Sequence, residues 1–378
     1  MQEIMQWLDI EVNRVKAKDI IQFEVISPDI QNATYSGSSI LINNKKYIYR
    51  SFKSWVELAS LYFCKILTPK VSLDNMIIIS YQKLDLNSSF HHNKTENKDE
   101  KYGVESSFFE IQKIEEPSFI YYYNQALKNV NIYNRKRVIN LGVNRADEFE
   151  VIESMLSKEQ FRDIDLVGVD YSHTAINYAK NRFKSKKFYQ YDINKLDDLN
   201  LGKFDLLITI GTLQSVNSNF KLLFISLVQN LLDSNSALIM GFPNSRWIDK
   251  EMIYGAKAPN YSYSELSILY KDVYFCKKYL QQHKYRVTIT GKDYIFLTAT
   301  KIYNWILELL CSVETEPTLD VLFYYVRLKP NLPKIFVGSC FSRTNKLVFF
   351  YALLFTCKSK VVVLFPQSGL VILISILL

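Results

Sequence analysis

Between residues 118 and 302 the sequence alternates short apolar runs with stretches whose apolar residues recur at helical spacing. The helical stretches include "SHTAINYAKNRF" (172–183) and "NFKLLFISLVQNLL" (219–232). Strands that are apolar along their whole length are typical of a parallel sheet, because helices cover both of its faces. The alternation therefore predicts an α/β domain with a doubly wound, mainly parallel, Rossmann-like sheet.

Seven runs are the strand candidates of this domain: 137–142, 165–170, 187–192, 204–211, 237–242, 285–290 and 294–301. Only Gly-Lys-Asp separates the last two runs, which is too short for a crossover helix. We expect these two strands to form an antiparallel hairpin at the edge of the sheet. Ligands of such sheets bind at the carboxyl ends of the strands, near the topological switch point.

The first strand candidate runs into a turn and a helix, "RVINLGVNRADEFEVI" (137–152), and this turn has one glycine where a nucleotide-binding turn usually has two or three. Asn144 can adopt a left-handed backbone, because asparagine tolerates that conformation better than other residues with a side chain. Ala146 is small enough for close packing between helix and strand. The turn is therefore still suited to holding a ligand.

This stretch resembles the glycine-rich first motif of class I S-adenosylmethionine-dependent methyltransferases, usually written D/E-x-G-x-G-x-G. The aligned positions are Asn140, Gly142, Asn144 and Ala146, so an amide replaces the leading acid and only the first glycine remains. A dinucleotide fingerprint needs G-x-G-x-x-G and an acid about 20 residues further on. The turn lacks that pattern, and its acid lies farther along the chain. A dehydrogenase is therefore a poor alternative.

The resemblance extends to the ends of the next three strands. It implies that Asp170, followed by Tyr171, accepts hydrogen bonds from the two ribose hydroxyls, and a carboxylate with two acceptor oxygens suits a diol. It places Asp192 at the adenine amino group and Ile193 against the ring. It places Gly211 and Thr212 beside the methionine part of the cofactor. The resemblance covers roughly 165 residues, one ordinary domain, and implies a seven-strand order with a reversed last strand.

The function that the resemblance implies is transfer of a methyl group from S-adenosylmethionine to an unidentified acceptor, which is a small molecule, an RNA or a protein. No Asn-Pro-Pro-Tyr follows the fourth strand, which argues against methylation of adenine or of a glutamine amide. No general base can be named. The alternative is a non-catalytic, methyltransferase-like binding module with a degenerate cofactor site, suggested by the altered Asn140, Asn144 and Ala146. The retained Asp170 and Asp192 argue against it.

The long segment after the fifth strand lies where this family places insertions that cover the substrate. It is rich in Tyr, Arg and Lys, and its candidates for substrate contacts are Arg246, Trp247, Tyr254, Tyr261 and Tyr263. Packing onto the sheet explains these side chains equally well.

The chain divides into four segments on this reading. Residues 1–88 form a small α+β N-terminal domain, and 89–117 form a polar linker. The methyltransferase domain covers 118–302, and 303–378 are an atypical tail. In the first segment "SSILINNKKYIYRSF" indicates two β-runs around an Asn-Asn turn, and "SWVELASLYFCKIL" indicates a helix.

Charge and cysteine usage set limits on partners and compartment. The net charge of +8 permits a nucleic-acid partner without indicating one. Five dispersed cysteines without a CxxC pair fit free thiols in a reducing cytoplasm, and the composition hints at a bacterial origin. None of the four histidines has metal-ligand spacing, so no metal site is expected. The oligomeric state cannot be read from the sequence.

The tail, 303–378, contains no acidic residue after Asp320 and ends in "KVVVLFPQSGLVILISILL". Its apolar runs are interrupted before they reach the roughly 20 residues of a spanning helix. Three interpretations are open: a membrane-associating tail, an additional β-rich subdomain, or a sequence that was never selected as protein, such as a shifted reading frame. We favour the third, because the seven-strand domain is complete near Ile302. A membrane partner is expected only if the tail is a selected sequence.

Overall fold

The computed structural model describes residues 1–302 apart from 32, 74, 89–99, 101, 215–218 and 256–265, and beyond 302 it describes the backbone of six strands. The chain separates into two compact units, Met1–Ile302 and Tyr303–Leu378. The substrate candidates Tyr261 and Tyr263 lie outside the described residues, as do His91 and His92, two of the four histidines for which the sequence predicts no metal site.

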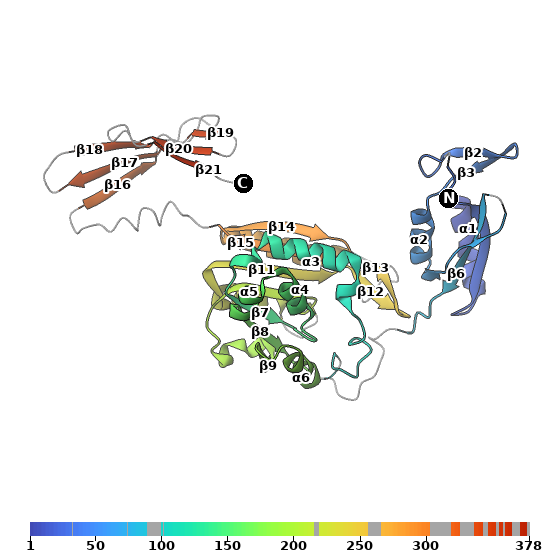
Figure 1. Cartoon of the computed structure of the whole chain (residues 1–378), viewed down its shortest axis with the longest axis horizontal. Coiled ribbons are helices and arrows are strands. Elements are labelled where there is room, and N and C mark those ends of the chain that lie inside the picture. The colour runs from blue at the N-terminus through green and yellow to red at the C-terminus, as the bar shows by residue number, and fades with distance from the viewer. Residues whose placement is uncertain are drawn as a thin grey trace. The chain divides into compact units, whose positions relative to one another are not determined.

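The centre of the first unit is a seven-stranded sheet in the order β14-β15-β11-β10-β7-β8-β9 (Figure 1). Its strands are β7 (Arg137–Leu141), β8 (Asp165–Asp170), β9 (Lys187–Gln190), β10 (Phe204–Ile210), β11 (Leu232–Pro243), β14 (Tyr285–Gly291) and β15 (Tyr294–Lys301). The pairs from β9 through β8, β7 and β10 to β11 are all parallel. Strand β15 is antiparallel to both of its neighbours, β11 and β14.

This order confirms the predicted α/β fold. The strand order reverses between β7 and β10, because the chain runs outward from β7 to β8 and β9 and then returns to the other side of β7. The carboxyl ends of β7 and β10 therefore flank the topological switch point, where open sheets bind ligands. The predicted hairpin is also confirmed: β14 is the edge strand, and β15 lies between it and β11.

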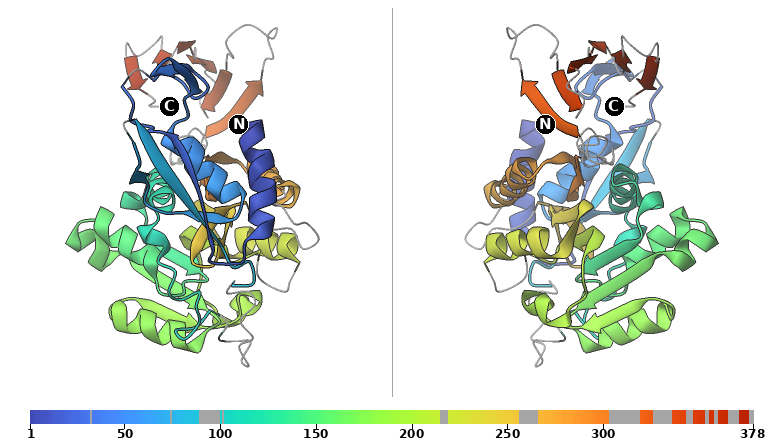
Figure 2. Two further views of the ribbon diagram at one scale, coloured as in Figure 1. Left: turned by 90° about the vertical axis from the view of Figure 1, so that its right-hand side faces the viewer. Right: turned by 90° about the vertical axis from the view of Figure 1, so that its left-hand side faces the viewer.

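Helices cover both faces of the central sheet, as two further views show (Figure 2). Helices α3 (Pro117–Asn129), α4 (Asp147–Met155), α5 (Lys158–Asp163) and α6 (His173–Arg182) contribute to one apolar core, with Val138 and Ile208 of the sheet. Helices α7 (Phe220–Ser226) and α8 (Ser267–Gln282) contribute to the other, with Ile139 and Leu207. Adjacent strand residues thus face opposite cores, which is why these strands are apolar throughout.

Local sequence signals set the ends of several helices. Ser172 begins α6 as an N-cap, and its hydroxyl accepts a hydrogen bond from the Ala175 N–H. Ser157 and Gln160 form a reciprocal capping box at α5. Pro117 occupies the first turn of α3, where its missing N–H costs nothing. Helix α7 continues into a π-helix, Leu227–Leu231, which leads directly into β11.

The N-terminal part of the first unit is a small α+β arrangement, as the sequence indicates. Its helices are α1 (Gln2–Arg14) and α2 (Phe52–Leu61), and its strands are β1 (Ile20–Ile26), β2 (Ser39–Ile42), β3 (Lys45–Ile48), β4 (Cys64–Ile66), β5 (Lys70–Val71) and β6 (Met76–Lys83). β2 and β3 form the hairpin expected around the Asn-Asn turn. Strand β1, which pairs with β6, is not expected from the sequence. The helix expected over "SWVELASLYFCKIL" ends at Leu61, and the end of that stretch forms β4, which also pairs with β6.

The hairpin of β12 (Ser245–Ile248) and β13 (Glu251–Tyr254) follows β11. Ile248 and Ile253 form a small apolar cluster with Leu84, against which Phe63 packs. Lys18 pairs with Asp249, and Lys65 pairs with Glu251. These contacts attach the hairpin to residues of the N-terminal part.

In the second unit the structure describes only the backbone of β16 (Leu319–Tyr325), β17 (Phe336–Ser342), β18 (Leu347–Ala352), β19 (Phe355–Cys357), β20 (Lys360–Leu364) and β21 (Val371–Ser375). They form two three-stranded sheets, β16-β17-β18 and β19-β20-β21. Among the described residues, none of the helices combines the length and apolar character needed to cross a bilayer.

Candidate functional site

The turn after β7 carries three residues with a positive φ angle. Gly142 has φ 73°, Asn144 has φ 43° and Ala146 has φ 61°. The left-handed conformation expected of Asn144 is confirmed. Ala146 is also left-handed, with ψ 36°, and it is completely buried as the N-cap of α4. Alanine in this conformation costs about 1–2 kcal/mol relative to a right-handed backbone, so the turn retains the shape of a glycine-rich turn at an energetic cost.

Asp170, the last residue of β8, lies directly beside this turn. Its Oδ2 accepts a hydrogen bond from the Asn144 N–H at 2.9 Å, and its Oδ1 accepts one from the Ser172 N–H at 3.0 Å. Burial raises the pKa of Asp170 above its ordinary value, although these N–H groups and the Lys113 ammonium act in the opposite direction. A carboxylate can accept about four hydrogen bonds. The two carboxylate oxygens of Asp170 can therefore still accept hydrogen bonds from a ligand.

The carboxyl ends of β7 and β10 approach each other closely at Gly142. A Cβ atom on Gly142 would lie 2.0 Å from Thr212 Oγ1, so a larger residue cannot occupy this position without a shift. The Thr212 hydroxyl donates to the Leu141 carbonyl oxygen at 3.0 Å, which joins the two strand ends. Gly211 has φ 71°, and its backbone N–H donates to the Gly241 carbonyl oxygen. The structure thus places Gly142, Gly211 and Thr212 together at the switch point.

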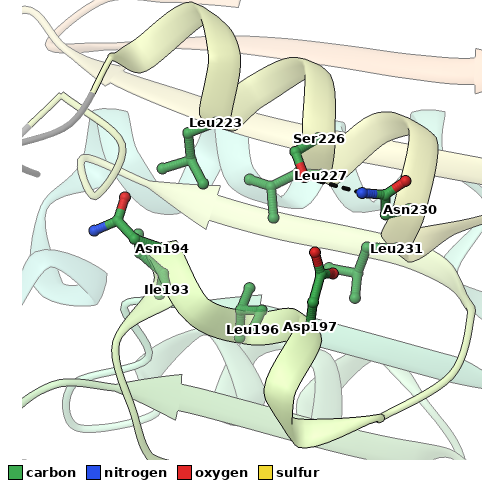
Figure 3. A pocket seen from close by; sticks show the side chains of 9 residues that line it. All are labelled: Ile193, Asn194, Leu196, Asp197, Leu223, Ser226, Leu227, Asn230 and Leu231. Carbon is green, nitrogen blue, oxygen red and sulfur yellow. Dashed lines mark hydrogen bonds between the residues drawn. The ribbon is translucent and has the colours of Figure 1, made fainter.

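Asp192 and Ile193 follow β9. The Asp192 carboxylate accepts hydrogen bonds from the backbone N–H and the side-chain amide of Asn194. Ile193 is buried, and it lines a small pocket of about 30 Å³ between the 3-10 helix Ile193–Leu199 and the segment Leu223–Leu231 (Figure 3). Tyr171 is about half exposed beside Asp170.

A segment N-terminal to the central sheet, residues 102–113, packs across the loops after β7 and β8; we call it the strap. The Asn144 side-chain amide donates to the Tyr102 carbonyl oxygen at 2.7 Å. The Arg145 guanidinium donates to the Phe109 carbonyl oxygen at 2.9 Å and lies over the rings of Phe109 and Tyr178. Just before the strap, the Glu100 carboxylate accepts hydrogen bonds at the N-terminus of α6. The strap is therefore attached to the turn and to the helix after Asp170.

The strap ends at Lys113, whose ammonium donates to Glu148 Oε1 at 2.5 Å. Glu148 lies in the first turn of α4, and its side chain is 1% exposed, against 18% for that of Lys113. Burial lowers the pKa of Lys113, but the negative charges of Glu148 and Asp147 outweigh this effect and raise it overall. Lys113 is therefore a cation held in a largely dry environment.

Several buried polar atoms on this side of the sheet have no hydrogen-bond partner among the described residues. They include both side-chain polar atoms of Asn140, Glu148 Oε2 and the Tyr123 hydroxyl. Asn140 lies between Val138 and Gly142 on the strand and so faces the same core as Val138, which contains α3 and α4. An unsatisfied buried polar group costs about 1–3 kcal/mol, and such groups are rare unless water or a ligand satisfies them.

Sequence reasoning did not identify Lys113, Glu148 or the strap as part of this site. The strap lies within residues 89–117, whose polar composition indicates a linker. The only available signal was the adjacent pair Asp147 and Glu148 in the first turn of α4; the structure shows that both acids are buried.

The remaining substrate candidates lie on the β12–β13 hairpin. Arg246 donates to the Gly255 carbonyl oxygen and lies over the Phe63 ring, and burial lowers its pKa. Trp247 is half-buried and Tyr254 is exposed. Arg246 thus has structural contacts within the first unit, and its role toward a substrate stays a prediction.

Residues 132–288 match a family described as "Methyltransferase domain". For these residues the match and the strand order agree with the methyltransferase resemblance that the sequence shows. The resemblance predicted from the sequence is confirmed for this domain. No curated protein matches the sequence.

Solved structures of methyltransferases are similar to part of the chain. The plantazolicin methyltransferase BpumL in complex with SAH is 12% identical, covers 54% of this chain and 94% of its own length, and has a TM-score of 0.38. A SAM-dependent methyltransferase from Aquifex aeolicus is 15% identical, covers 51% and 98%, and has a TM-score of 0.35. Magnesium protoporphyrin IX methyltransferase from Synechocystis PCC 6803 with bound SAM is 15% identical, covers 51% and 85%, and has a TM-score of 0.33.

Proposed function

We propose that the central domain binds S-adenosylmethionine at the carboxyl ends of β7, β8, β9 and β10 and transfers its methyl group to an acceptor. The observation that carries this proposal is the hydrogen bond from the Asn144 N–H to Asp170 Oδ2 at 2.9 Å. It joins the turn of the first motif to the carboxylate at the end of the next strand, so that both face one ligand position.

The residues present fit this cofactor. The turn keeps its left-handed geometry although two of its three glycines are replaced, and the close approach of Gly142 to Thr212 keeps the switch point narrow. Asp170 would hold the ribose hydroxyls, and Asp192 and Ile193 would contact the adenine. Gly211 and Thr212 would lie beside the methionine part, where the two unpartnered polar atoms of Asn140 favour a polar ligand group.

S-adenosylmethionine carries an activated methyl group on its sulfonium, so the protein needs to supply mainly positioning and exclusion of water. In this chain the turn and Asp170 would fix the nucleoside, and the strap would shield it from solvent. A general base is required only if the acceptor loses a proton during attack, and the site identifies none. The acceptor stays unassigned.

A non-catalytic binding module is the second candidate. The replacement of the leading acid by Asn140, and of two glycines by Asn144 and Ala146, favours it. Under this alternative the domain binds the cofactor weakly or not at all, and its role rests on protein contacts. Asp170 and Asp192 favour the catalytic proposal, because both carboxylates lie at strand ends where they can contact a ligand.

Equilibrium titration of the full-length protein with S-adenosylmethionine, S-adenosylhomocysteine and NAD separates these proposals. We expect saturable binding of the first two and none of NAD. Transfer of labelled methyl groups into components of a cell extract would then demonstrate catalysis. Binding of NAD alone, or of none of the three, would contradict the proposal.

A further inference from the structure

The Lys113–Glu148 ion pair is buried beside the Phe119 ring and is incompletely hydrogen-bonded. A buried ion pair contributes little to stability unless every charged atom is satisfied, because desolvation offsets the attraction between the charges. Here Glu148 is 1% exposed and its Oε2 atom has no hydrogen-bond partner among the described residues. An ion pair left incomplete in this way suits a ligand that supplies the missing contacts.

The strap delivers Lys113 to the candidate cofactor site. Its contacts from Asn144 to Tyr102 and from Arg145 to Phe109 hold it across the turn. The Lys113 ammonium is also close enough to Asp170 to affect its carboxyl group electrostatically. The strap is bonded to Asn144, whose backbone N–H donates to Asp170 Oδ2, so Lys113 belongs to a segment that is attached at the same turn as Asp170 although it precedes the sheet.

The two charges of the pair are complementary to those of a zwitterion. Lys113 is a cation with further N–H donors, and a carboxylate is its natural partner. Glu148 Oε2 is an unpartnered acceptor with negative charge, suited to an ammonium group. Asn140, buried on the α3 and α4 side of β7, adds a donor and an acceptor. An α-amino acid group carries one carboxylate and one ammonium on the same carbon.

We propose that the Lys113–Glu148 pair positions the cofactor by binding the amino-acid end of S-adenosylmethionine, with Lys113 at its carboxylate and Glu148 at its ammonium. This inference rests on the proposed function, which assigns the nucleoside end to Asp170 and Asp192. It gives the strap a role in binding, since the strap supplies the cation. It also accounts for a buried charged pair that packing alone leaves incomplete.

The test compares two ligands that differ at this end. S-adenosylhomocysteine has the amino-acid group, whereas 5′-methylthioadenosine has the same nucleoside and sulfur without it. Their affinities are measured by calorimetry for the wild type, Lys113→Met and Glu148→Gln, all in the full chain. Lys128→Met is the matched control, because Lys128 is exposed in the last turn of α3.

We expect Lys113→Met to weaken S-adenosylhomocysteine binding about 10- to 100-fold, since a charge-assisted contact is lost, and to leave methylthioadenosine binding within about twofold. Glu148→Gln should weaken the first ligand selectively as well. Lys113→Arg should retain most of the affinity, and this variant keeps the test valid if the methionine variant does not fold. Lys128→Met should change neither affinity.

Equal loss of both ligands in Lys113→Met, or no loss of either, would overturn the inference and leave the proposed function intact. Failure of the wild-type protein to bind either compound would overturn the proposed function and this inference with it. A wild type that binds methylthioadenosine as tightly as S-adenosylhomocysteine would contradict the inference alone, because the amino-acid end would then contribute nothing.

Discussion

The backbone N–H of Asn144 donates to Asp170 Oδ2 at 2.9 Å, while the Asn144 side-chain amide donates to the Tyr102 carbonyl oxygen at 2.7 Å. One residue thus connects the turn after β7, the carboxylate at the end of β8 and the strap. Glycine at this position could make the first contact and not the second. The replacement of glycine by Asn144 in the motif therefore attaches the strap to the turn.

The Asn144 position can be tested by two substitutions. Asn144→Gly relieves a left-handed backbone but loses the bond to Tyr102, which contributes about 0.5–1.5 kcal/mol, so the free energy of unfolding should change by less than about 1 kcal/mol. Asn144→Val should lose about 2 kcal/mol, because a β-branched residue is strained at positive φ. Denaturant unfolding measures both. Equal stability of the two variants would show that the side chain at this position experiences no such strain.

A substitution at Ala146 should increase the stability of the folded protein, because it removes strain from the backbone. The left-handed backbone of Ala146 costs about 1–2 kcal/mol, and glycine removes this cost while losing about 0.4–1 kcal/mol through the greater freedom of the unfolded chain. We therefore expect Ala146→Gly to raise the free energy of unfolding by about 0–1.6 kcal/mol. Ala179→Gly, in the interior of α6, should lower it by about 1 kcal/mol. If both variants are destabilised alike, the left-handed conformation of Ala146 is not strained.

Much of the central domain could be predicted because its strands are buried on both faces. Val138 and Ile139 face opposite cores, so β7 is apolar on both faces. It can therefore be recognised from its own sequence, without information on the strands that pair with it. The left-handed Asn144 was predictable for a similar local reason, since few other residues tolerate that backbone. Strand β1 carries a weaker signal: Phe23 and Val25 alternate with Gln22 and Glu24, the pattern of a half-buried strand.

The strap could not be predicted in the same way. Its composition is mixed, it follows a polar stretch that indicates a linker, and its place in the fold depends on partners that are distant in sequence. Lys113 meets Glu148 35 positions later, and Tyr102 meets Asn144 42 positions later. Neither contact leaves a periodic pattern. Similarly, the 3.6-residue spacing of 219–232 indicates one helix, whereas the chain forms α7, a π-helix and the start of β11 there.

The raised pKa of Asp170 predicts an opposite pH dependence of stability and of binding. The folded-state pKa lies above the ordinary value of 3.8, so protonation of Asp170 favours the folded state at acid pH, and this contribution is lost as the pH rises through the raised pKa. Binding needs the carboxylate, so affinity for S-adenosylhomocysteine should fall as the pH drops through that pKa. Calorimetry on the wild type and Asp170→Asn measures this effect. An equally steep dependence in Asp170→Asn would assign the titration to another group.

Truncation tests the interpretation of residues 303–378. The first compact unit ends at Ile302 in the sequence, and a chain that ends there should be more soluble than the full length, because it lacks a long apolar segment. It should also bind S-adenosylhomocysteine with the same affinity. Loss of the folded central domain on truncation would show that the tail belongs to the fold. Flotation of only the full-length protein with lipid vesicles would support the membrane interpretation instead.

The most direct test of the cofactor site is the affinity of Asp170→Ala for S-adenosylmethionine, measured by calorimetry beside the wild type and Asp163→Ala, which removes an exposed acid at the end of α5. Loss of the charge-assisted contacts of Asp170 should weaken binding by about 2 kcal/mol or more, roughly 30-fold, while the control should bind as the wild type does. Asp192→Ala should lose less, because Ile193 retains its apolar contact. Unchanged affinity in a folded Asp170→Ala protein would contradict the placement of the cofactor at this site.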